Sequence, residues 1–260
     1  MKELLILARD AAQKAGDAIA SHYGTDAFEL KADNSPVTLA DTEAHRIVTL
    51  ILGHTNILIL SEEDAERTPT PYPERMWIID PLDGTKGFLK HTDDFSVMIA
   101  LLEHGRPVLS VVHAPILGKH YFATKDGGAF IEDTAGIRPL RVSGRTSPEL
   151  RGVVSVNHAA PYMFDLCTKL EVTETVAIGS VGIKAGYIAE DRADFYVTRG
   201  ALGEWDVCAP ELILTEAGGK VTDIYGAPLV YGTQDHRVER GVVFSNGACH
   251  EAIITALYSV

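Results

Sequence analysis

One stretch constrains this chain more than any other, and it runs from Trp77 to Phe88 with the sequence Trp-Ile-Ile-Asp-Pro-Leu-Asp-Gly-Thr-Lys-Gly-Phe. The apolar run at 76–79 predicts a buried strand. We expect that strand to end at Asp80, because Pro81 cannot donate to a strand ladder and an Asp-Gly pair at Asp83 is typical of a turn. Asp80 and Asp83 are therefore predicted to lie on a bend at the carboxyl end of a strand, where open α/β sheets usually bind ligands.

Gly84 and Thr85 follow these acids and provide backbone N–H groups and a hydroxyl that suit a phosphate. The neighbouring carboxylates would repel that phosphate, and the net charge of the chain, −13, adds to the repulsion. A cation between the acids and the phosphate removes this conflict, so the stretch predicts a metal site. Because no His or Cys lies beside the acids, Mg²⁺ is favoured over zinc.

Acidic residues elsewhere occupy comparable positions. Glu62 and Glu63 follow a predicted strand at 57–60, so acids from two strand ends are expected to converge, and Asp206 lies at the predicted start of a helix. Each acid also has a purely structural interpretation. Asp80 and Asp83 fit a turn whose aspartates bond their own backbone, the two glutamates fit a solvated loop start, and Asp206 fits a helix N-cap.

Two further helix starts allow either a structural or a functional interpretation. Thr38 and Asp41 fit a variant of the capping box before a helix over 39–52. Ser180 precedes a predicted helix over 181–190, and the free N–H groups of that helix, together with Lys184, suit a second phosphate or a nucleoside. The alternative is an ordinary Ser180 N-cap with a solvent-facing lysine. The sequence alone leaves both interpretations open.

The rest of the chain predicts a mixed α/β protein with two lobes. The first half combines amphipathic helices over 2–22 and 39–52 with antiparallel strands over 95–102, 107–112, 119–123 and 129–132. The second half alternates strands and helices, which indicates a second layered α/β unit. The segment 143–150 is the predicted boundary, so we expect an N-terminal lobe over 1–145 and a C-terminal lobe over 146–260.

Composition excludes several classes of function. The acidic balance argues against binding a nucleic acid polymer, which needs Lys and Arg patches. Cys167, Cys208 and Cys249 form no C-x-x-C motif and are expected to be reduced, mostly buried thiols of a cytoplasmic protein. No apolar run approaches about 18 residues, so no membrane span is predicted, and the short apolar run at the N-terminus does not fit a signal peptide.

The order of these motifs resembles the inositol monophosphatase superfamily over nearly the full length. The resemblance is carried by Asp33-Asn-Ser-Pro-Val-Thr38-Leu-Ala-Asp41, by Ser61-Glu62-Glu63, by the stretch 77–86 and by Glu204-Trp205-Asp206. Asp83-Gly-Thr-Lys86, together with 34–38, looks more like the 3′(2′),5′-bisphosphate nucleotidase branch, because enzymes acting on inositol phosphate more typically have Thr in place of Lys86. Gly87 departs from that branch, in which Glu is common at this position.

The resemblance implies an α/β fold, a layered αβαβα sandwich with the active site between two lobes. It also implies hydrolysis of phosphate monoesters with two or three Mg²⁺ ions. Mn²⁺ is expected to substitute for Mg²⁺, and Li⁺ is expected to inhibit the hydrolysis. The metal ligands that it assigns are Glu62, Asp80, Asp83, Asp206 and the carbonyl of Leu82.

The same resemblance assigns catalysis to Asp41, Thr85 and Glu62, with Thr85 and Asp41 orienting the nucleophilic water. The substrate contacts that it implies are Gly84, Thr85, Lys86, Ser180, Lys184, Glu204 and Asp206, with Arg199 also at the rim.

The predicted reaction removes the 3′-phosphate of adenosine 3′,5′-bisphosphate and gives AMP and phosphate. Inositol monophosphate and fructose 1,6-bisphosphate are the alternative substrates, and a metal- or nucleotide-binding module without turnover is the alternative from a different class. A haloacid-dehalogenase phosphatase is disfavoured by the Asp-x-x-Asp spacing, and P-loop and Rossmann fingerprints are absent. We expect a monomer or a homodimer that acts on a small phosphate ester.

Overall fold

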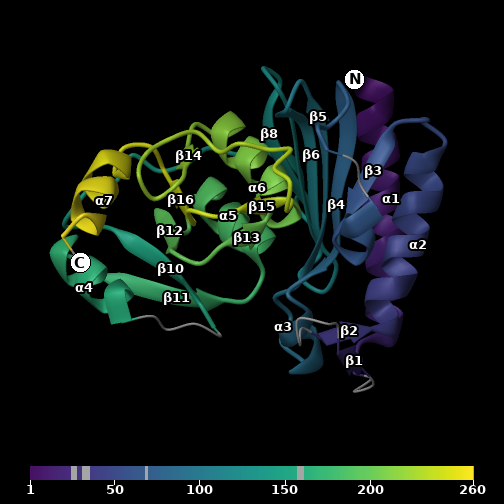
Figure 1. The fold of residues 1–260 in the computed structure, drawn as a ribbon. Helices are drawn as coiled ribbons and strands as arrows, with labels where there is room; N and C mark the ends of the chain where they lie inside the picture. The colour runs from purple at the N-terminus through teal and green to yellow at the C-terminus, as the bar shows by residue number, and fades with distance from the viewer. Residues whose placement is uncertain (25–27, 31–35, 68–69, 157–160, 260) are drawn as a thin grey trace.

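The computed structural model describes residues 1–24, 28–30, 36–67, 70–156 and 161–259, which form five layers (Figure 1). Two helices cover a seven-stranded sheet, a central pair of helices separates this sheet from a five-stranded sheet, and two more helices cover the far side. This arrangement confirms the layered αβαβα sandwich that the resemblance implied.

The first layer pairs α1 (Lys2–His22) with α2 (Leu39–Gly53). Each helix buries one stripe of small and aliphatic residues against the large sheet, which is the pattern of an amphipathic surface helix. α2 begins with the predicted capping box, in which the Thr38 side chain accepts from the Asp41 N–H and the Asp41 carboxylate accepts from the Thr38 N–H.

The large sheet follows chain order, and its strands are β3 (Leu58–Ser61), β4 (Arg75–Asp83), β5 (Ser96–Glu103), β6 (Arg106–Ala114), β7 (Lys119–Thr124), β8 (Gly128–Asp133) and β9 (Gly136–Pro139). β3 and β4 are parallel, and every later pair is antiparallel. Each of the two predicted hairpins is closed by its predicted turn, β5–β6 at His104-Gly105 and β7–β8 at Lys125-Asp126-Gly127. Because β3 and β4 are parallel, their carboxyl ends lie at the same edge of the sheet.

β4 differs from the prediction in one respect that matters for the site. It does not end at Asp80 but continues through Pro81 to Asp83. The pairing with β5 is interrupted between Asp80 and Asp83 and resumes with Asp83 opposite Ser96, while β3 pairs only as far as Ile79. Pro81 therefore falls where no neighbouring strand needs its missing N–H, and the irregularity displaces the chain without ending the strand.

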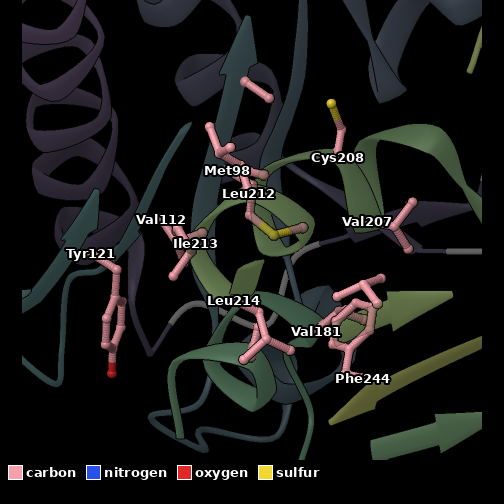
Figure 2. Packing of buried hydrophobic residues seen from close by; sticks show 14 of the residues in the cluster. Met98, Val112, Tyr121, Val181, Val207, Cys208, Leu212, Ile213, Leu214 and Phe244 are labelled. Atoms are coloured by element: carbon pink, nitrogen blue, oxygen red, sulfur yellow. The ribbon is translucent and has the colours of Figure 1, made fainter. Parts of the chain in front are cut away.

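The central layer consists of α5 (Val181–Ala189) and α6 (Glu204–Glu216), and it connects the two halves of the chain. Figure 2 shows side chains of α6, such as Leu212 and Ile213, beside Met98 and Val112 of the large sheet. The same buried cluster reaches Phe244 of the small sheet, so both sheets share one core. The boundary between lobes near residue 145 stays a prediction.

The small sheet has the order β11-β10-β12-β16-β14, with β10 (Arg151–Ser155), β11 (Glu174–Ile178), β12 (Phe195–Thr198), β14 (Lys220–Thr222) and β16 (Val242–Ser245). Its outer face carries α4 (Pro161–Lys169) and α7 (His250–Leu257) (Figure 1). The alternation of strands and helices predicted for the second half is confirmed. The short elements that the sequence did not predict are β1 (Phe28–Leu30), β2 (Pro36–Thr38), the 3₁₀ helix η1 (Glu62–Arg67), α3 (Thr85–Leu89), β9, β13 (Leu202–Gly203) and β15 (Arg237–Val238).

The cysteines and the helices agree with the predictions from composition. Cys208 and Cys249 are buried free thiols, and Cys167 is partly buried. Among the residues that the structure describes, no helix combines the length and the apolar character needed to cross a bilayer.

Two glycines on one face of α5 allow the helix to lie directly on the large sheet. A Cβ at Gly182 would lie 2.7 Å from Ser96 Oγ and 2.8 Å from Met98 Sδ. A Cβ at Gly186 would lie 2.6 Å from Cζ of Tyr121, whose ring is fully buried. Because α5 carries part of the site described below, its close packing also determines the position of that site.

We predict that Gly186→Ala lowers the free energy of unfolding by about 1 kcal/mol. Overpacking costs about 1–3 kcal/mol, and the better helix propensity of Ala returns about 1 kcal/mol. Gly53→Ala, at the end of α2 where a new Cβ has no atom within 4 Å, is the matched control and should leave stability equal or slightly higher. Urea unfolding at constant pH measures both variants, and a Gly186→Ala protein as stable as the control would contradict the packing.

Candidate active site

Three buried or partly buried aspartates converge from distant parts of the chain. Asp80 and Asp83 lie on the last residues of β4, and Asp206 lies in the first turn of α6. One carboxylate oxygen from each residue lies within 4.8 Å of the other two. The convergence arises because α6, from the second half of the chain, packs on the sheet that contains β4.

These acids border a cavity of about 480 Å³ between the two halves of the chain. Glu62, the first residue of η1 directly after β3, lines the same cavity. The predicted residues that line it from the first half are Glu62, Asp80, Leu82, Asp83, Gly84, Thr85 and Lys86, and those from the second half are Lys184 and Asp206. Asp33, Asn34 and Ser35, which belong to the motif noted in the sequence, lie outside the described residues.

Asp83 is held by donors from two elements. Its Oδ2 accepts hydrogen bonds from the Ser180 hydroxyl, from the Gly182 N–H at 2.9 Å and from the Ser96 hydroxyl at 3.3 Å. No sequence pattern indicates Ser96 as a donor to Asp83, because its place opposite Asp83 depends on strand register. The amide of Gly182 belongs to the first turn of α5, where the helix dipole favours a negative charge.

Asp80 and Asp206 each accept a hydrogen bond from a nearby backbone N–H with one carboxylate oxygen. Asp80 Oδ1 accepts from the Leu82 N–H at 3.0 Å, and Asp206 Oδ2 accepts from the Gly203 N–H at 2.7 Å. The structural interpretation of Asp80 as a residue that bonds its own turn is therefore correct, without excluding a metal. Asp206 is not an N-cap: it is the third residue of α6, and its carboxylate accepts from the N–H of the N-cap residue Gly203, which has no side chain to return the bond.

The acids perturb one another because little water separates them. Burial, and then the charge of Glu62, raise the pKa of Asp80 well above its usual range. Burial, followed by the charges of Glu62 and Asp83, raises the pKa of Asp206 to about 8. Burial also raises the pKa of Asp83, although the Ser180 and Gly182 bonds oppose that rise. Without a counter-charge, the Asp206 carboxyl therefore holds its proton at neutral pH.

An oxygen-only donor set of this kind fits a hard divalent cation. Magnesium prefers carboxylate and carbonyl oxygens, and a cation among these acids would remove the repulsion that raises their pKa values. The described residues include no other group of three or more His, Cys, Asp or Glu side chains with ligand atoms this close together.

Thr85 and Asp41 form the pair that the sequence predicted. The Thr85 hydroxyl lies 3.1 Å from Asp41 Oδ1 and 3.1 Å from the Leu82 carbonyl, either of which accepts its proton. Asp41 uses its other oxygen in the capping box with Thr38, so the structural and functional interpretations of Asp41 both describe the same side chain. Gly84, with φ of 96°, makes the turn that begins α3 at Thr85.

The start of α5 differs from the expectation that its N–H groups are free for a phosphate. The Gly182 N–H donates to Asp83, the Ile183 N–H donates to the Ser180 hydroxyl at 3.0 Å, and the Gly179 N–H donates to Asp94. Ser180 is fully buried, so it is the N-cap of α5 and does not reach the cavity as the predicted substrate contact. The positive end of this helix is directed to Asp83.

Lys184 is not the solvent-facing lysine of the alternative interpretation. Its side chain is only 2 % exposed, and its Nζ donates to Ser155 Oγ at 3.0 Å and to the Gly179 carbonyl at 2.9 Å. The Nζ also lies 4.6 Å from the centroid of the Tyr196 ring. Burial lowers its pKa to about 8. Lys184 is thus a buried cation that borders the cavity.

Glu204 and Arg199 are placed differently from the rim contacts that the sequence implied. Glu204 is fully buried, and its carboxylate accepts from the N–H groups of Gly232 and Thr233 and from the Tyr72 hydroxyl. A direct substrate contact for Glu204 does not fit this position. The guanidinium of Arg199 stacks 4.7 Å from the Tyr162 ring centroid and donates to the carbonyl of Leu257.

Comparison with known proteins decides the family. The model of the Inositol monophosphatase family matches this sequence over residues 1–260. The chain belongs to the inositol monophosphatase family.

Several inositol monophosphatase family members are similar over most of their length. The 3′(2′),5′-bisphosphate nucleotidase CysQ of Shigella flexneri is 38 % identical over 236 residues, which cover 88 % of this chain and 94 % of the relative. The fructose-1,6-bisphosphatase/inositol-1-monophosphatase of Thermotoga maritima is 32 % identical and covers 95 % of this chain and 93 % of the relative. The crystal structure of CysQ from Bacteroides thetaiotaomicron has a TM-score of 0.81 at 31 % identity and covers 95 % and 98 % of the two chains. The chain is thus a phosphatase of this family, and a module without turnover is not supported.

The acidic cluster predicts how the stability of the metal-free protein changes with pH. The folded Asp206 carboxyl keeps its proton up to about pH 8, whereas the unfolded one loses it above about pH 4. The unfolded state therefore binds fewer protons between these values, so this group destabilises the fold as pH rises. Asp206→Asn resembles the protonated form at every pH.

We predict that Asp206→Asn is as stable as wild type near pH 4 in EDTA and increasingly more stable than wild type as pH rises to 7.5. The difference should grow by up to about 1.4 kcal/mol per pH unit between pH 6 and 7.5. Histidines titrate in both proteins, so their contribution cancels in the difference between the two free energies of unfolding. Urea unfolding at each pH measures it, with Asp10→Asn, at an exposed position of α1, as the control. A difference that is constant or that shrinks with rising pH would show that the Asp206 carboxyl does not retain its proton.

Proposed function

We propose that this chain is a Mg²⁺-dependent phosphomonoesterase that removes the 3′-phosphate of adenosine 3′,5′-bisphosphate. The products are AMP and inorganic phosphate. One observation carries the proposal, namely the convergence of Asp80, Asp83 and Asp206 within 4.8 Å in a cavity that Thr85, which is hydrogen-bonded to Asp41, also lines. The similarity to CysQ nucleotidases supports this choice of substrate class.

The residues that would hold two or three metal ions are Glu62, Asp80, Asp83, Asp206 and the Leu82 carbonyl. All five line the cavity, and all offer oxygen ligands. Bound divalent cations would lower the pKa of a coordinated water and neutralise charge on the transferred phosphoryl group. Mn²⁺ is expected to substitute for Mg²⁺, and Li⁺ is expected to inhibit.

Thr85 and Asp41 orient the attacking water. The Thr85 hydroxyl donates its proton to Asp41 or to the Leu82 carbonyl, so its oxygen can accept a hydrogen bond from water in the cavity. Asp41 is fixed in turn, because the Thr38 N–H at 2.7 Å holds its second oxygen. Glu62, which follows β3 at the same edge of the sheet, adds a carboxylate to the cavity that Thr85 lines.

The phosphate would bind at the start of α3. The amides of Gly84 and Thr85 lie at this turn, and Lys86 adds a cation to the cavity wall. Lys184 adds a second cation from the opposite half of the chain. A bisphosphate carries two charged groups and an inositol monophosphate one, so two cations at one cavity favour the bisphosphate.

Hydrolysis of inositol monophosphate or fructose 1,6-bisphosphate is the alternative reaction at the same site. The Thermotoga maritima relative, whose name includes both activities, favours keeping it as an alternative. The expectation of a monomer or a homodimer stays a prediction.

We predict that Thr85→Val lowers kcat by about 100-fold or more and changes KM little. Valine keeps the shape of the side chain but cannot accept a hydrogen bond from water, and positioned proton acceptors contribute about 10²–10⁴-fold. Thr85→Ser keeps the hydroxyl and should stay within about tenfold of wild type. Steady-state phosphate release at saturating Mg²⁺ measures both. Equal kcat values for Thr85→Val and wild type would remove Thr85 from the mechanism.

A substrate comparison tests the reaction itself. With Mg²⁺, we expect kcat/KM for adenosine 3′,5′-bisphosphate to exceed that for inositol 1-phosphate and fructose 1,6-bisphosphate by about tenfold or more, which corresponds to about 1.4 kcal/mol in the transition state. EDTA should abolish phosphate release from all three substrates, and Li⁺ should lower it. Faster release from either of the other two compounds would reassign the substrate.

A further inference from the structure

Asp94 connects the loop before β5 with the start of α5. The Gly179 N–H donates to its Oδ2, and the Thr92 hydroxyl donates to its Oδ1. The Ser180 N–H donates to its backbone carbonyl at 3.2 Å. Asp94 therefore binds both residues that immediately precede α5, and it belongs to the opposite half of the chain.

The surroundings of Asp94 leave little room for another arrangement. A Cβ at Gly179 would lie 2.9 Å from Asp94 Oδ2, and a Cβ at Gly87 would lie 3.1 Å from Asp94 Oδ1. A Cβ at Gly84 would lie 3.1 Å from the Asp94 carbonyl. Glycine at these three positions lets the backbone approach the Asp94 carboxylate and carbonyl closely.

The loop that carries Asp94 has a firm base. The next residue, Phe95, is fully buried and packs against Phe88 and Tyr23, with ring centroids 5.4 and 5.2 Å apart. The Thr92 N–H donates to the Gly87 carbonyl at 3.0 Å. A side chain on such a base can fix the position of what it binds.

We infer that Asp94 is a positioning residue that fixes the start of α5, where Ser180 and Gly182 hold Asp83, and thereby sets the affinity of the site for a divalent cation. This inference rests on the proposed role of Asp83 as a metal ligand. Asp94 itself is not among the described residues that line the cavity, and both of its carboxylate oxygens accept hydrogen bonds from the protein.

The chain of contacts has two steps. Asp94 holds Gly179 and Ser180, and Ser180 and Gly182 donate to Asp83 Oδ2. Loss of the Asp94 carboxylate leaves the Gly179 N–H without its acceptor and lets the first turn of α5 move away from Asp83. The partners that orient a metal ligand typically change metal affinity by about 10–100-fold when they are removed.

Binding of Mn²⁺ to the metal-free, full-length protein tests the inference without any substrate. Isothermal titration calorimetry or electron paramagnetic resonance of free Mn²⁺ gives the dissociation constant. Asp94→Ala should weaken binding by about tenfold. Asp94→Asn removes the charge but keeps an oxygen acceptor for the Gly179 N–H, so it should stay within about twofold of wild type.

Asp93→Ala is the matched control for loss of nearby charge. Asp93 is exposed, and its carboxylate accepts from the Tyr23 hydroxyl at 2.9 Å instead of reaching α5. It should leave Mn²⁺ affinity within about twofold of wild type, because it does not contact α5. Thr92→Val, which removes one donor to Asp94, should give an intermediate loss and provides a second variant if Asp94→Ala does not fold.

The outcomes separate the possible roles. A loss of affinity in Asp94→Asn as large as in Asp94→Ala would show that charge, not position, matters and would overturn the inference. A lower melting temperature of Asp94→Ala with unchanged Mn²⁺ affinity would overturn it as well. Absence of Mn²⁺ binding by the wild-type protein would instead contradict the proposed metal site.

Discussion

Carboxylates that are brought together out of water repel one another, and the structure around the cavity counters this repulsion. Each of the three aspartates receives at least one backbone N–H: Asp80 from Leu82, Asp206 from Gly203, and Asp83 from Gly182. These donors orient the acids but do not offset their burial and mutual repulsion, as the raised pKa values of Asp80 and Asp206 show. A divalent cation would supply the missing positive charge, and this makes the site suitable for such an ion.

The layered architecture makes this convergence possible. β4 supplies two acids at a sheet edge, and its irregular pairing at Pro81 lets the strand continue until Asp83 faces α5. α6 lies in the core that both sheets share, and this places Asp206 opposite β4. The site therefore depends on long-range packing between the two halves of the chain, although Asp80 and Asp206 each accept one local backbone hydrogen bond.

Much of this arrangement could be predicted from the sequence. Apolar periodicity predicts the positions of most helices and strands, and the acids at strand ends indicate a metal site from the sequence alone. Residues whose partners lie far away in the sequence could not be predicted in the same way. Ser96 is a donor to Asp83 only because of strand register, and Glu204 is buried because Gly232, Thr233 and Tyr72 surround it. The pattern at Ser180 fits either a helix N-cap or a substrate contact. In the structure Ser180 is the N-cap, because the nearby N–H groups of Gly182 and Gly179 donate to Asp83 and Asp94.

The double use of Asp41 has a consequence for how this protein can change. One oxygen of its carboxylate closes the first turn of α2, and the other accepts from Thr85 beside the cavity. Under the proposed role of Asp41, folding of an outer helix and chemistry in the cavity share one carboxyl group, so selection for turnover would also maintain the helix. Adaptation to new substrates is accordingly easier through the cavity wall of the second half than through α2.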